Sequence, residues 1–415
     1  MFMKIPSLKS VTKKLPITEL ESTDVFYIPL QAYFGTMKPL VAVGQKVQQY
    51  LPLAEGKDGS RIHAPVSGEI LELNYLINEN PHLVLQNDFT NTTYIDQELE
   101  SATELTDKIR LAGISGSGGA GFPTHIKYKT NAIDTLIVNG VECEPYLTAD
   151  YALMYDEAGE ILKAAQASAQ YFGAKNIVIG LEKQNKELVK IFESHSELMH
   201  GVSFKLLPNT YPQGGELQLI KAVIGKEIPK GSIPADEGVV VSNVATLLAV
   251  YKALELNQPN IDRVVTVSGE AAKHYGNFRV KIGTPIEYVL KKAGVNAANV
   301  DVVLGGPMMG KIVTDLKQPI SKTSGGLLSF KKSAVKENNC IQCSYCADAC
   351  PQHLMPMQFA SAKFDHDTQK FIQFNVLDCI ECGACQYICP SNVPLMQSIS
   401  EGKSLLKSLQ NSVPV

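Results

Sequence analysis

The chain has 415 residues, of which 45% are hydrophobic, and a formal net charge of −4 from 38 basic and 42 acidic side chains. This length allows about two to four domains, since one core rarely grows beyond roughly 250–300 residues, and the charge gives no electrostatic reason to expect a nucleic-acid partner. The most apolar long stretch, residues 238–256, is interrupted by polar and charged residues, so we expect no transmembrane segment.

The N-terminal part, residues 1–92, is expected to form a small β domain. Residues 1–16 are basic without an apolar core, which argues against a secretory signal and for the cytoplasm. Short alternating segments at 41–47, 51–54 and 62–70 are punctuated by Gly and Pro, as is typical of strands. The pattern is similar to the barrel-sandwich fold of biotinyl and lipoyl carriers. Lys38 is followed at once by a proline, and we expect it to be unmodified.

A glycine-rich loop, GISGSGGAGFPTHIK at 113–127, follows a polar segment that is expected to be a linker or a surface helix. The loop contains a G-x-G-x-x-G pattern, but helical spacing precedes it and the strand at 135–139 follows it. A Rossmann turn needs the opposite order, so we do not expect one. Five glycines within 113–121 still leave backbone amides free to meet a phosphate or a flat ring. The alternative is a flexible turn without a ligand.

Residues 93–256 are expected to form a layered α/β domain, because strands such as 176–180 alternate with helical stretches such as 158–171. The charged residues 182–190 are expected to be a solvated helix face. Residues 257–330 begin with a strand, VVTVSG, and include a helix at 286–293.

Eight of the nine cysteines lie in two runs, CIQCSYCADACP at 340–351 and CIECGACQYICP at 379–390. Each has the spacing of bacterial ferredoxins, in which three thiolates hold one [4Fe–4S] cluster and the fourth reaches the other cluster. The spacing predicts a two-cluster module at 331–400, followed by a tail at 401–415. Two zinc sites are the alternative, but zinc usually takes its ligands as close pairs. The expected ligand sets are Cys340, Cys343, Cys346 and Cys389 for one cluster, and Cys379, Cys382, Cys385 and Cys350 for the other.

Four further segments occur in a fixed order: GSGGAGFPTHIK at 116–127, VNGVECEPYLTAD at 138–150, YPQGGELQLI at 211–220 and SNVATL at 242–247. With the two cysteine runs, they resemble the NADH-binding flavoprotein of respiratory complex I and, most closely, the family of RnfC proteins from Rnf electron-transport complexes. The resemblance implies a multidomain α/β fold: an N-terminal barrel-sandwich β domain, a complex I flavoprotein-like α/β domain, a β-grasp domain and a C-terminal helical ferredoxin-like domain.

The same resemblance implies FMN and NADH as cofactors, although the residues alone do not separate FMN from FAD. No side chain is expected to act as a catalytic acid or base. Cys143 is expected to be a packed thiol. Gly215 stands where complex I has the first of two consecutive glutamates. The implied cofactor-binding residues are Gly116, Gly118, Gly119, Gly121, Phe122, Lys127, Asn139, Glu142, Glu144, Glu216, Asn243 and Thr246.

The function implied by the resemblance is that of an NAD(H)-facing subunit of an Rnf-type ferredoxin:NAD oxidoreductase. Such a subunit would be peripheral on the cytoplasmic side of the membrane. Its partners would be membrane and iron–sulfur subunits, which connect it indirectly to ferredoxin and couple electron flow to Na⁺ or H⁺ translocation. Two alternatives remain open: a soluble NADH-dependent carrier that feeds another reductase, such as an amino-acid reductase, and a non-enzymatic iron–sulfur wire with a degenerate flavin site.

Overall fold

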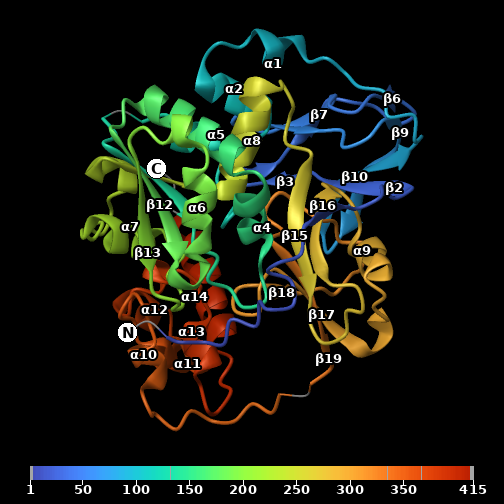
Figure 1. The fold of residues 1–415 in the computed structure, drawn as a ribbon. Helices are drawn as coiled ribbons and strands as arrows, with labels where there is room; N and C mark the ends of the chain where they lie inside the picture. Colours follow the sequence, from blue (N-terminus) through green and yellow to red (C-terminus); the bar gives the residue numbers. More distant parts are fainter. Residues whose placement is uncertain (1–2, 131, 334, 366, 412–415) are drawn as a thin grey trace.

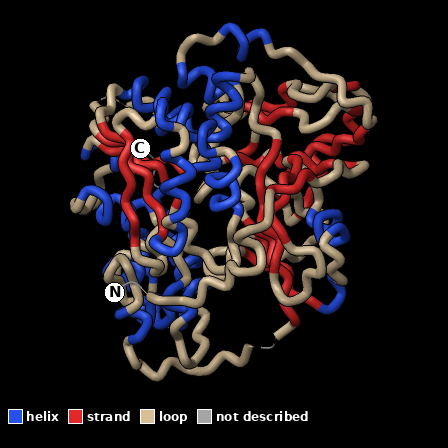
Figure 2. The backbone as a smooth tube through the Cα atoms, viewed as in Figure 1, coloured by secondary structure: helices blue, strands red, loops and turns tan. Residues whose placement is uncertain are grey.

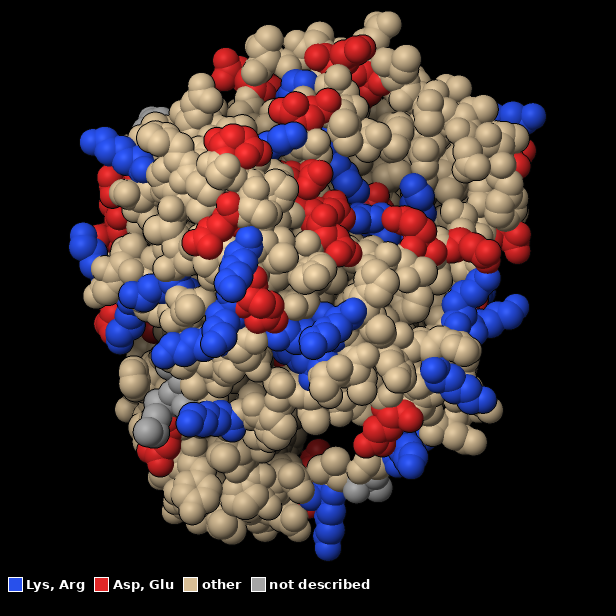
Figure 3. Space-filling view, viewed as in Figure 1, with Lys and Arg blue, Asp and Glu red and all other residues tan. Residues whose placement is uncertain are grey.

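The computed structural model describes residues 3–130, 132–333, 335–365 and 367–411. Its elements form a β part, an α/β layer, a second sheet and a helical C-terminal module (Figure 1). Basic and acidic side chains are intermingled on the face that Figure 3 shows. No helix in the described part of the chain is long and apolar enough to cross a membrane.

The N-terminal β part packs a four-stranded sheet, in the order β2-β10-β9-β6, against a three-stranded sheet, in the order β5-β7-β8. Buried side chains such as Phe26, Leu53 and Leu83 fill the space inside it. The predicted strand at 41–47 is confined to Lys46–Val47, because the chain turns at Gly44, whose φ is +80°. The strands are β2 (Val25–Pro29), β3 (Gln31–Ala32), β4 (Gly35–Thr36), β5 (Lys38–Pro39), β6 (Lys46–Val47), β7 (Pro52–Glu55), β8 (Arg61–His63), β9 (Gly68–Ile77) and β10 (Asn80–Asn87).

The α/β layer is built on a four-stranded sheet in the order β13-β12-β11-β14, with all neighbours parallel. Its strands are β11 (Thr135–Gly140), β12 (Asn176–Glu182), β13 (Val202–Leu207) and β14 (Val239–Asn243). Its helices are α1 (Gln97–Ser101), α2 (Leu105–Leu111), α3 (Thr124–Lys127), α4 (Ala149–Asp156), α5 (Ala158–Phe172), α6 (Glu187–Glu193), α7 (Glu216–Ile224) and α8 (Val244–Glu255).

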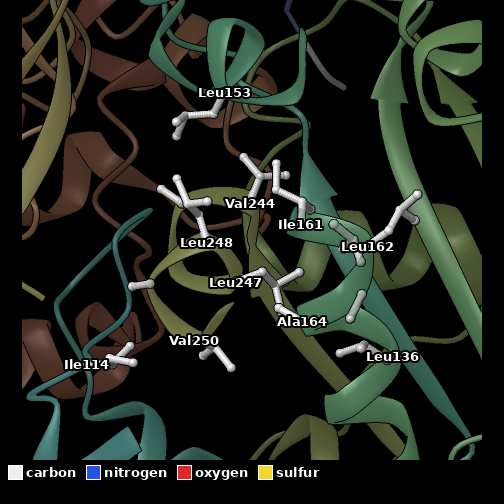
Figure 4. Packing of buried hydrophobic residues seen from close by; sticks show 14 of the residues in the cluster. Ile114, Leu136, Leu153, Ile161, Leu162, Ala164, Val244, Leu247, Leu248 and Val250 are labelled. Atoms are coloured by element: carbon white, nitrogen blue, oxygen red, sulfur yellow. The ribbon is translucent and has the colours of Figure 1, made fainter. Parts of the chain in front are cut away.

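Both faces of this sheet are covered, because successive side chains of a strand point to opposite faces. Leu136 of β11 packs into the cluster formed by α5 and α8, in which Ile161 and Leu247 lie (Figure 4). Ile137, the next residue, packs into a second cluster with Leu219 of α7. The central strand β11 is therefore apolar from Leu136 to Val138, as expected of a strand buried on both faces.

A six-stranded mixed sheet, in the order β1-β16-β15-β19-β17-β18, forms the second sheet of the molecule. Strand β1 (Ile17–Glu19) pairs in parallel with β16, so residues 17–19 extend this sheet and not the N-terminal β part. The other elements are β15 (Asp262–Ser268), β16 (Gly276–Lys281), α9 (Ile286–Lys292), β17 (Val300–Leu304), β18 (Lys311–Ile312) and β19 (Gly326–Lys331).

The C-terminal module is helical, and an extended segment after β19 leads to it (Figure 2). Its core joins Phe359, Phe371 and Ile399 to buried cysteines of both runs. Two helices, α11 and α12, lie between the two cysteine runs. The helices are α10 (Tyr345–Asp348), α11 (Pro356–Phe364), α12 (Thr368–Gln373), α13 (Ala384–Tyr387) and α14 (Leu395–Asn411).

One predicted surface is partly wrong. Within residues 182–190, expected to be a solvated helix face, Glu182 is buried. The N-terminal segment lies over this position, and the Nζ atom of Lys9 is 3.5 Å from a carboxylate oxygen of Glu182. The segment before the first sheet therefore packs along the α/β layer, a long-range contact that the local charge pattern does not reveal.

Candidate functional site

The carboxyl end of the parallel sheet brings together two of the predicted residues. Asn139 at the end of β11 pairs in register with Asn243 at the end of β14. The order of the strands reverses here, because β12 and β13 lie on one side of β11 and β14 lies on the other. Open α/β sheets bind ligands outside the carboxyl ends of their strands at such a switch point. The sheet geometry therefore marks this edge as the candidate site.

The glycine-rich loop lies over Asn243. The amide nitrogen of Ser117 donates a hydrogen bond to Oγ1 of Thr246 at 3.0 Å, and the amide of Gly116 donates to the carbonyl of Phe122 at 2.9 Å. A Cβ at Gly118 would lie 3.1 Å from Nδ2 of Asn243, so the backbone approaches this side chain closely. Thr246 is thus a support for the loop, since its hydroxyl oxygen is already used there.

Residues 118–120 at the tip of this loop are exposed. The structure records no hydrogen-bond partner among the described residues for the three amide nitrogens of Gly118, Gly119 and Ala120. A Cβ at Gly119 would meet no atom within 4 Å. Successive free amides in a turn form a concave donor surface that suits a phosphate or another anion. The tip of the loop is therefore available to a ligand.

A buried ion pair, Asp150 with Arg263, lies beneath the loop. Nη2 of Arg263 donates to the carbonyl oxygen of Ser117 at 3.3 Å and lies 3.8 Å from Oδ1 of Asp150. The other carboxylate oxygen of Asp150 accepts from Nδ2 of Asn243 at 2.6 Å. The Nε and Nη1 atoms of Arg263 have no partner among the described residues, although the side chain is buried. The sequence pattern did not predict this pair; its only signal was a basic residue directly before the apolar residues of β15.

Two predicted glutamates accept backbone hydrogen bonds. Glu142 accepts from the amides of Asp150 at 3.2 Å and Tyr151 at 3.4 Å, and burial together with the nearby charge of Asp150 raises the pKa of Glu142 to about 8. Glu144 accepts from Met308 at 3.1 Å and Met309 at 2.8 Å. Burial raises the pKa of Glu144 to about 7, although these two amides oppose the shift. Glu144 thereby holds the loop at 305–310 against the α/β layer.

Three other predicted residues bind to the protein itself. Nδ2 of Asn139 donates to the carbonyl of Gly214 at 3.0 Å, and Nζ of Lys127 lies 2.5 Å from a carboxylate oxygen of Glu216. The Lys127–Glu216 pair is partly exposed and joins α3 to the first residue of α7. A side chain at Gly215 would collide with Gln218. A glutamate at position 215 would therefore need Gln218 to move.

The cysteines surround two separate hollows of the C-terminal module. Cys340, Cys343 and Cys346 of the first run lie around one hollow together with Cys389 of the second run. The other hollow is lined by Cys350 of the first run together with Cys379, Cys382 and Cys385 of the second. Four soft thiol donors around each space suit an iron–sulfur cluster. The donor sets present in this chain therefore fit two such clusters.

The two cysteine loops share a backbone conformation. Gln342 and Ser344 in the first run, and Glu381 and Gly383 in the second, all have φ between +54° and +73°. The amides of Gln342 and Glu381 point at the sulfurs of Cys340 and Cys379, at 3.4 and 3.3 Å. Left-handed conformations are uncommon in residues other than glycine. Their repetition in both loops wraps the chain around each hollow.

The second cysteine run contacts the α/β layer and its neighbours. The hydroxyl of Tyr211 donates to the carbonyl of Cys382 at 2.6 Å. A Cβ at Gly383 would collide with the carbonyl oxygen of Met308. Nζ of Lys230 lies 2.7 Å from a carboxylate oxygen of Asp378. In contrast, Cys340 and Cys343 of the first run are exposed. The hollow of the second run therefore lies on the side of the α/β layer.

Cys143 is also part of this junction. Its sulfur accepts a weak hydrogen bond from the amide of Gly214 at 3.4 Å. It packs in the same small cluster as Tyr211, Met308 and Cys382. Burial raises the pKa of the Cys143 thiol to about 12, so the uncharged thiol is favoured.

Three parts of the chain match known families. Residues 3–89 match the RnfC barrel sandwich hybrid domain, residues 109–252 the Nuo51 FMN-binding domain and residues 339–393 the 4Fe-4S dicluster domain. These matches confirm the barrel-sandwich, flavoprotein-like and iron–sulfur parts of the predicted multidomain α/β fold.

Over 97% of its length, the chain is 37% identical to the C subunit of the ion-translocating oxidoreductase complex of Serratia proteamaculans, and 36% identical to that of Pectobacterium atrosepticum. It spans 60% and 61% of the length of these relatives. A chain in a crystal structure of NAD⁺-reducing [NiFe]-hydrogenase has a similar fold, with a TM-score of 0.53 at 15% identity over 75% of this chain and 67% of that chain.

Proposed function

We propose that this chain, which matches the RnfC barrel sandwich hybrid domain and resembles the C subunits of ion-translocating oxidoreductase complexes over 97% of its length, is the NAD(H)-facing electron-transfer subunit of such a complex. The observation that carries the proposal is the direct contact between its two candidate sites. Tyr211 lies close in sequence to Gly214, whose carbonyl binds Asn139, and Met308 donates to Glu144. Both Tyr211 and Met308 contact the loop of the second cysteine run. Electron transfer between two bound groups requires this kind of proximity.

The flavin site is proposed to be an FMN site at the carboxyl edge of the parallel sheet. The exposed amides at 118–120 are suited to its phosphate. Lys127 can add a positive charge when its ion pair with Glu216 opens. The close approach of Gly118 to Asn243 leaves a side-chain-free surface for a flat ring. When bound, FMN supplies the exchange between the electron pair of nicotinamide and the single electrons of iron–sulfur clusters.

Two [4Fe–4S] clusters are proposed for the two hollows, each held by three cysteines of one run and the last cysteine of the other. The placement of the thiols supports this crossed ligation. The contacts of Cys382 and Gly383 support a position of the second run nearer the flavin site. The exposed Cys340 and Cys343 of the first run lie on the far side, where a partner could approach.

The finer architecture and the assembly also belong to this proposal. The strand order β16-β15-β19-β17, with β15 and β19 parallel, supports a β-grasp domain within 257–330. We propose domains at 1–92, 93–256, 257–330 and 331–400. Strand β1 belongs to the first of these in sequence but pairs with β16 in the sheet of the third. By analogy with the names of the relatives, the partners would be the other subunits of an ion-translocating complex, with this chain peripheral on the cytoplasmic side.

The test uses anaerobically purified protein that has been reconstituted with iron and sulfide and given FMN. Iron and sulfide are counted first, and about eight irons per chain are expected for two clusters. NADH is then added while flavin absorbance and the EPR spectrum are recorded. Flavin bleaching together with cluster signals supports the proposed route. Full iron loading without any response to NADH would refute the dehydrogenase function and favour a wire with a degenerate flavin site.

A further inference from the structure

A hairpin of the N-terminal β part carries two aromatic side chains at its tip. Strands β3 and β4 pair Gln31 with Thr36 and Ala32 with Gly35, so Tyr33 and Phe34 are the two residues of the turn. Such tight turns usually carry Gly, Asn or Asp. Tyr33 is 51% exposed and Phe34 is 45% exposed. Two large rings at a two-residue tip keep apolar surface in water, which is costly unless a ligand covers it.

The hairpin tip reaches the glycine-rich loop. The ring centroid of Tyr33 lies 5.0 Å from that of Phe122, with the ring planes at 79°. Phe34 lies 6.3 Å from Phe122 and 5.1 Å from Tyr33. The three rings thus meet edge to face and form one aromatic wall, with two members from the β part and one from the end of the loop.

The wall stands beside a surface suited to phosphate. Phe122 directly follows Gly121, and the amides at 118–120 are exposed without a partner among the described residues. These are the amides proposed above for the FMN phosphate, so the wall borders the flavin site. Aromatic rings bind the flat faces of bases, and a nicotinamide dinucleotide on the flavin carries a second flat ring, its adenine. The reacting nicotinamide must lie on the flavin, so the adenine is the ring that is free to reach the wall.

We propose that Tyr33 and Phe34 are binding residues for the adenine end of the nicotinamide dinucleotide, and that they form this subsite with Phe122. This inference rests on the proposed function. It gives the barrel-sandwich domain a part in nucleotide recognition. A purely structural role, in which the rings only hold the β part against the loop, predicts a different pattern of losses.

The test measures the Kd values of the full-length, FMN-loaded protein for NAD⁺, for ADP-ribose and for nicotinamide mononucleotide. In the double variant Tyr33→Ala/Phe34→Ala, the Kd for NAD⁺ and for ADP-ribose should rise about tenfold or more, since a base–aromatic contact has roughly this effect. The Kd for nicotinamide mononucleotide, which has no adenine, should be unchanged, and so should the Kd for FMN.

Phe89→Ala is the matched control, because Phe89 is an aromatic residue of the same β part with 54% exposure and no ring contact among the described residues. Tyr33→Leu/Phe34→Leu guards against misfolding, since it keeps apolar bulk at the tip while removing the rings. Unchanged ADP-ribose binding in a folded double variant overturns the inference alone. Equal losses for FMN and ADP-ribose with a lower Tm overturn it too, in favour of packing. Wild-type protein that binds FMN but not NAD⁺ overturns the proposed function and this inference with it.

Discussion

The hydroxyl of Tyr211 donates a hydrogen bond to the carbonyl oxygen of Cys382 at 2.6 Å, and both residues are buried. Tyr211 lies just before Gly214, whose carbonyl accepts from the Asn139 side chain. A single tyrosine therefore connects the carboxyl edge of the parallel sheet to a cysteine loop. This contact joins segments that are far apart in the chain, and it helps to hold the cysteine loop against the α/β layer.

Tyr211→Phe should loosen this junction without changing the fold. The variant leaves the buried carbonyl of Cys382 unpaired, which should lower the free energy of unfolding by about 1–3 kcal/mol. The EPR spectrum of the cluster held by the second run should also change. Tyr128→Phe is the control, since its buried hydroxyl also loses a hydrogen bond, to Ser242 at 2.8 Å. If the Tyr211→Phe and Tyr128→Phe variants give the same EPR spectrum, a role for Tyr211 at the cysteine loop is contradicted.

The crossed cysteine sets predict which double variants lose both clusters. Cys350→Ala should remove the cluster of the second run, about four of about eight irons, because Cys350 lines that hollow. Adding Cys382→Ala should cost no further iron, since both residues line the same hollow. Adding Cys343→Ala should abolish the remaining cluster. Iron analysis and EPR after reconstitution check this. If Cys350→Ala selectively loses the signal of the other cluster, the ligation is not crossed.

Glu142 makes stability depend on pH. Its pKa is raised from 4.5 to about 8 in the folded protein, so between these values the folded state keeps a proton that the unfolded chain releases. Glu142 therefore destabilises the folded protein least below pH 4.5. As the pH rises toward 8, its ionisation lowers the free energy of unfolding by at most about 1.4 kcal/mol per pH unit. Glu142→Gln should remove this loss. Its Tm relative to wild type should climb from pH 5 to pH 8; parallel Tm curves would count against the shift.

The grouping of the cysteines around two hollows could be predicted from the sequence because their spacing is local. Each run wraps its own hollow, and only its last cysteine crosses over. The loop and the strand after it were also predictable, since the order of a helix, glycines and a strand is visible in consecutive residues. Helix α2 and strand β11 indeed flank the loop.

The parts that sequence reasoning missed are long-range pairings. Asp150 and Arg263 lie on elements of different layers, and nothing in their local patterns shows that they meet beneath Ser117. Glu182 belongs to a charged stretch, and only the packing of Lys9 over it explains its burial. Likewise, the register that aligns Asn139 with Asn243 is a property of the assembled sheet. Local spacing identified the residue types, whereas tertiary packing decided their neighbours.

The adjacent glycines Gly118 and Gly119 separate the shape of the loop from contact with its ligand. A Cβ at Gly118 would press on Asn243 at 3.1–3.2 Å, whereas one at Gly119 would meet no atom within 4 Å. Gly118→Ala should therefore lower both the Tm and the affinity for FMN. Gly119→Ala should leave the Tm unchanged and weaken FMN binding roughly tenfold, an effect of about 1.4 kcal/mol, because the added methyl occupies the surface proposed for the ligand. Flavin titration and thermal unfolding of the two variants measure both effects. Full FMN affinity in Gly119→Ala would mean that the flavin does not lie against the tip of the loop.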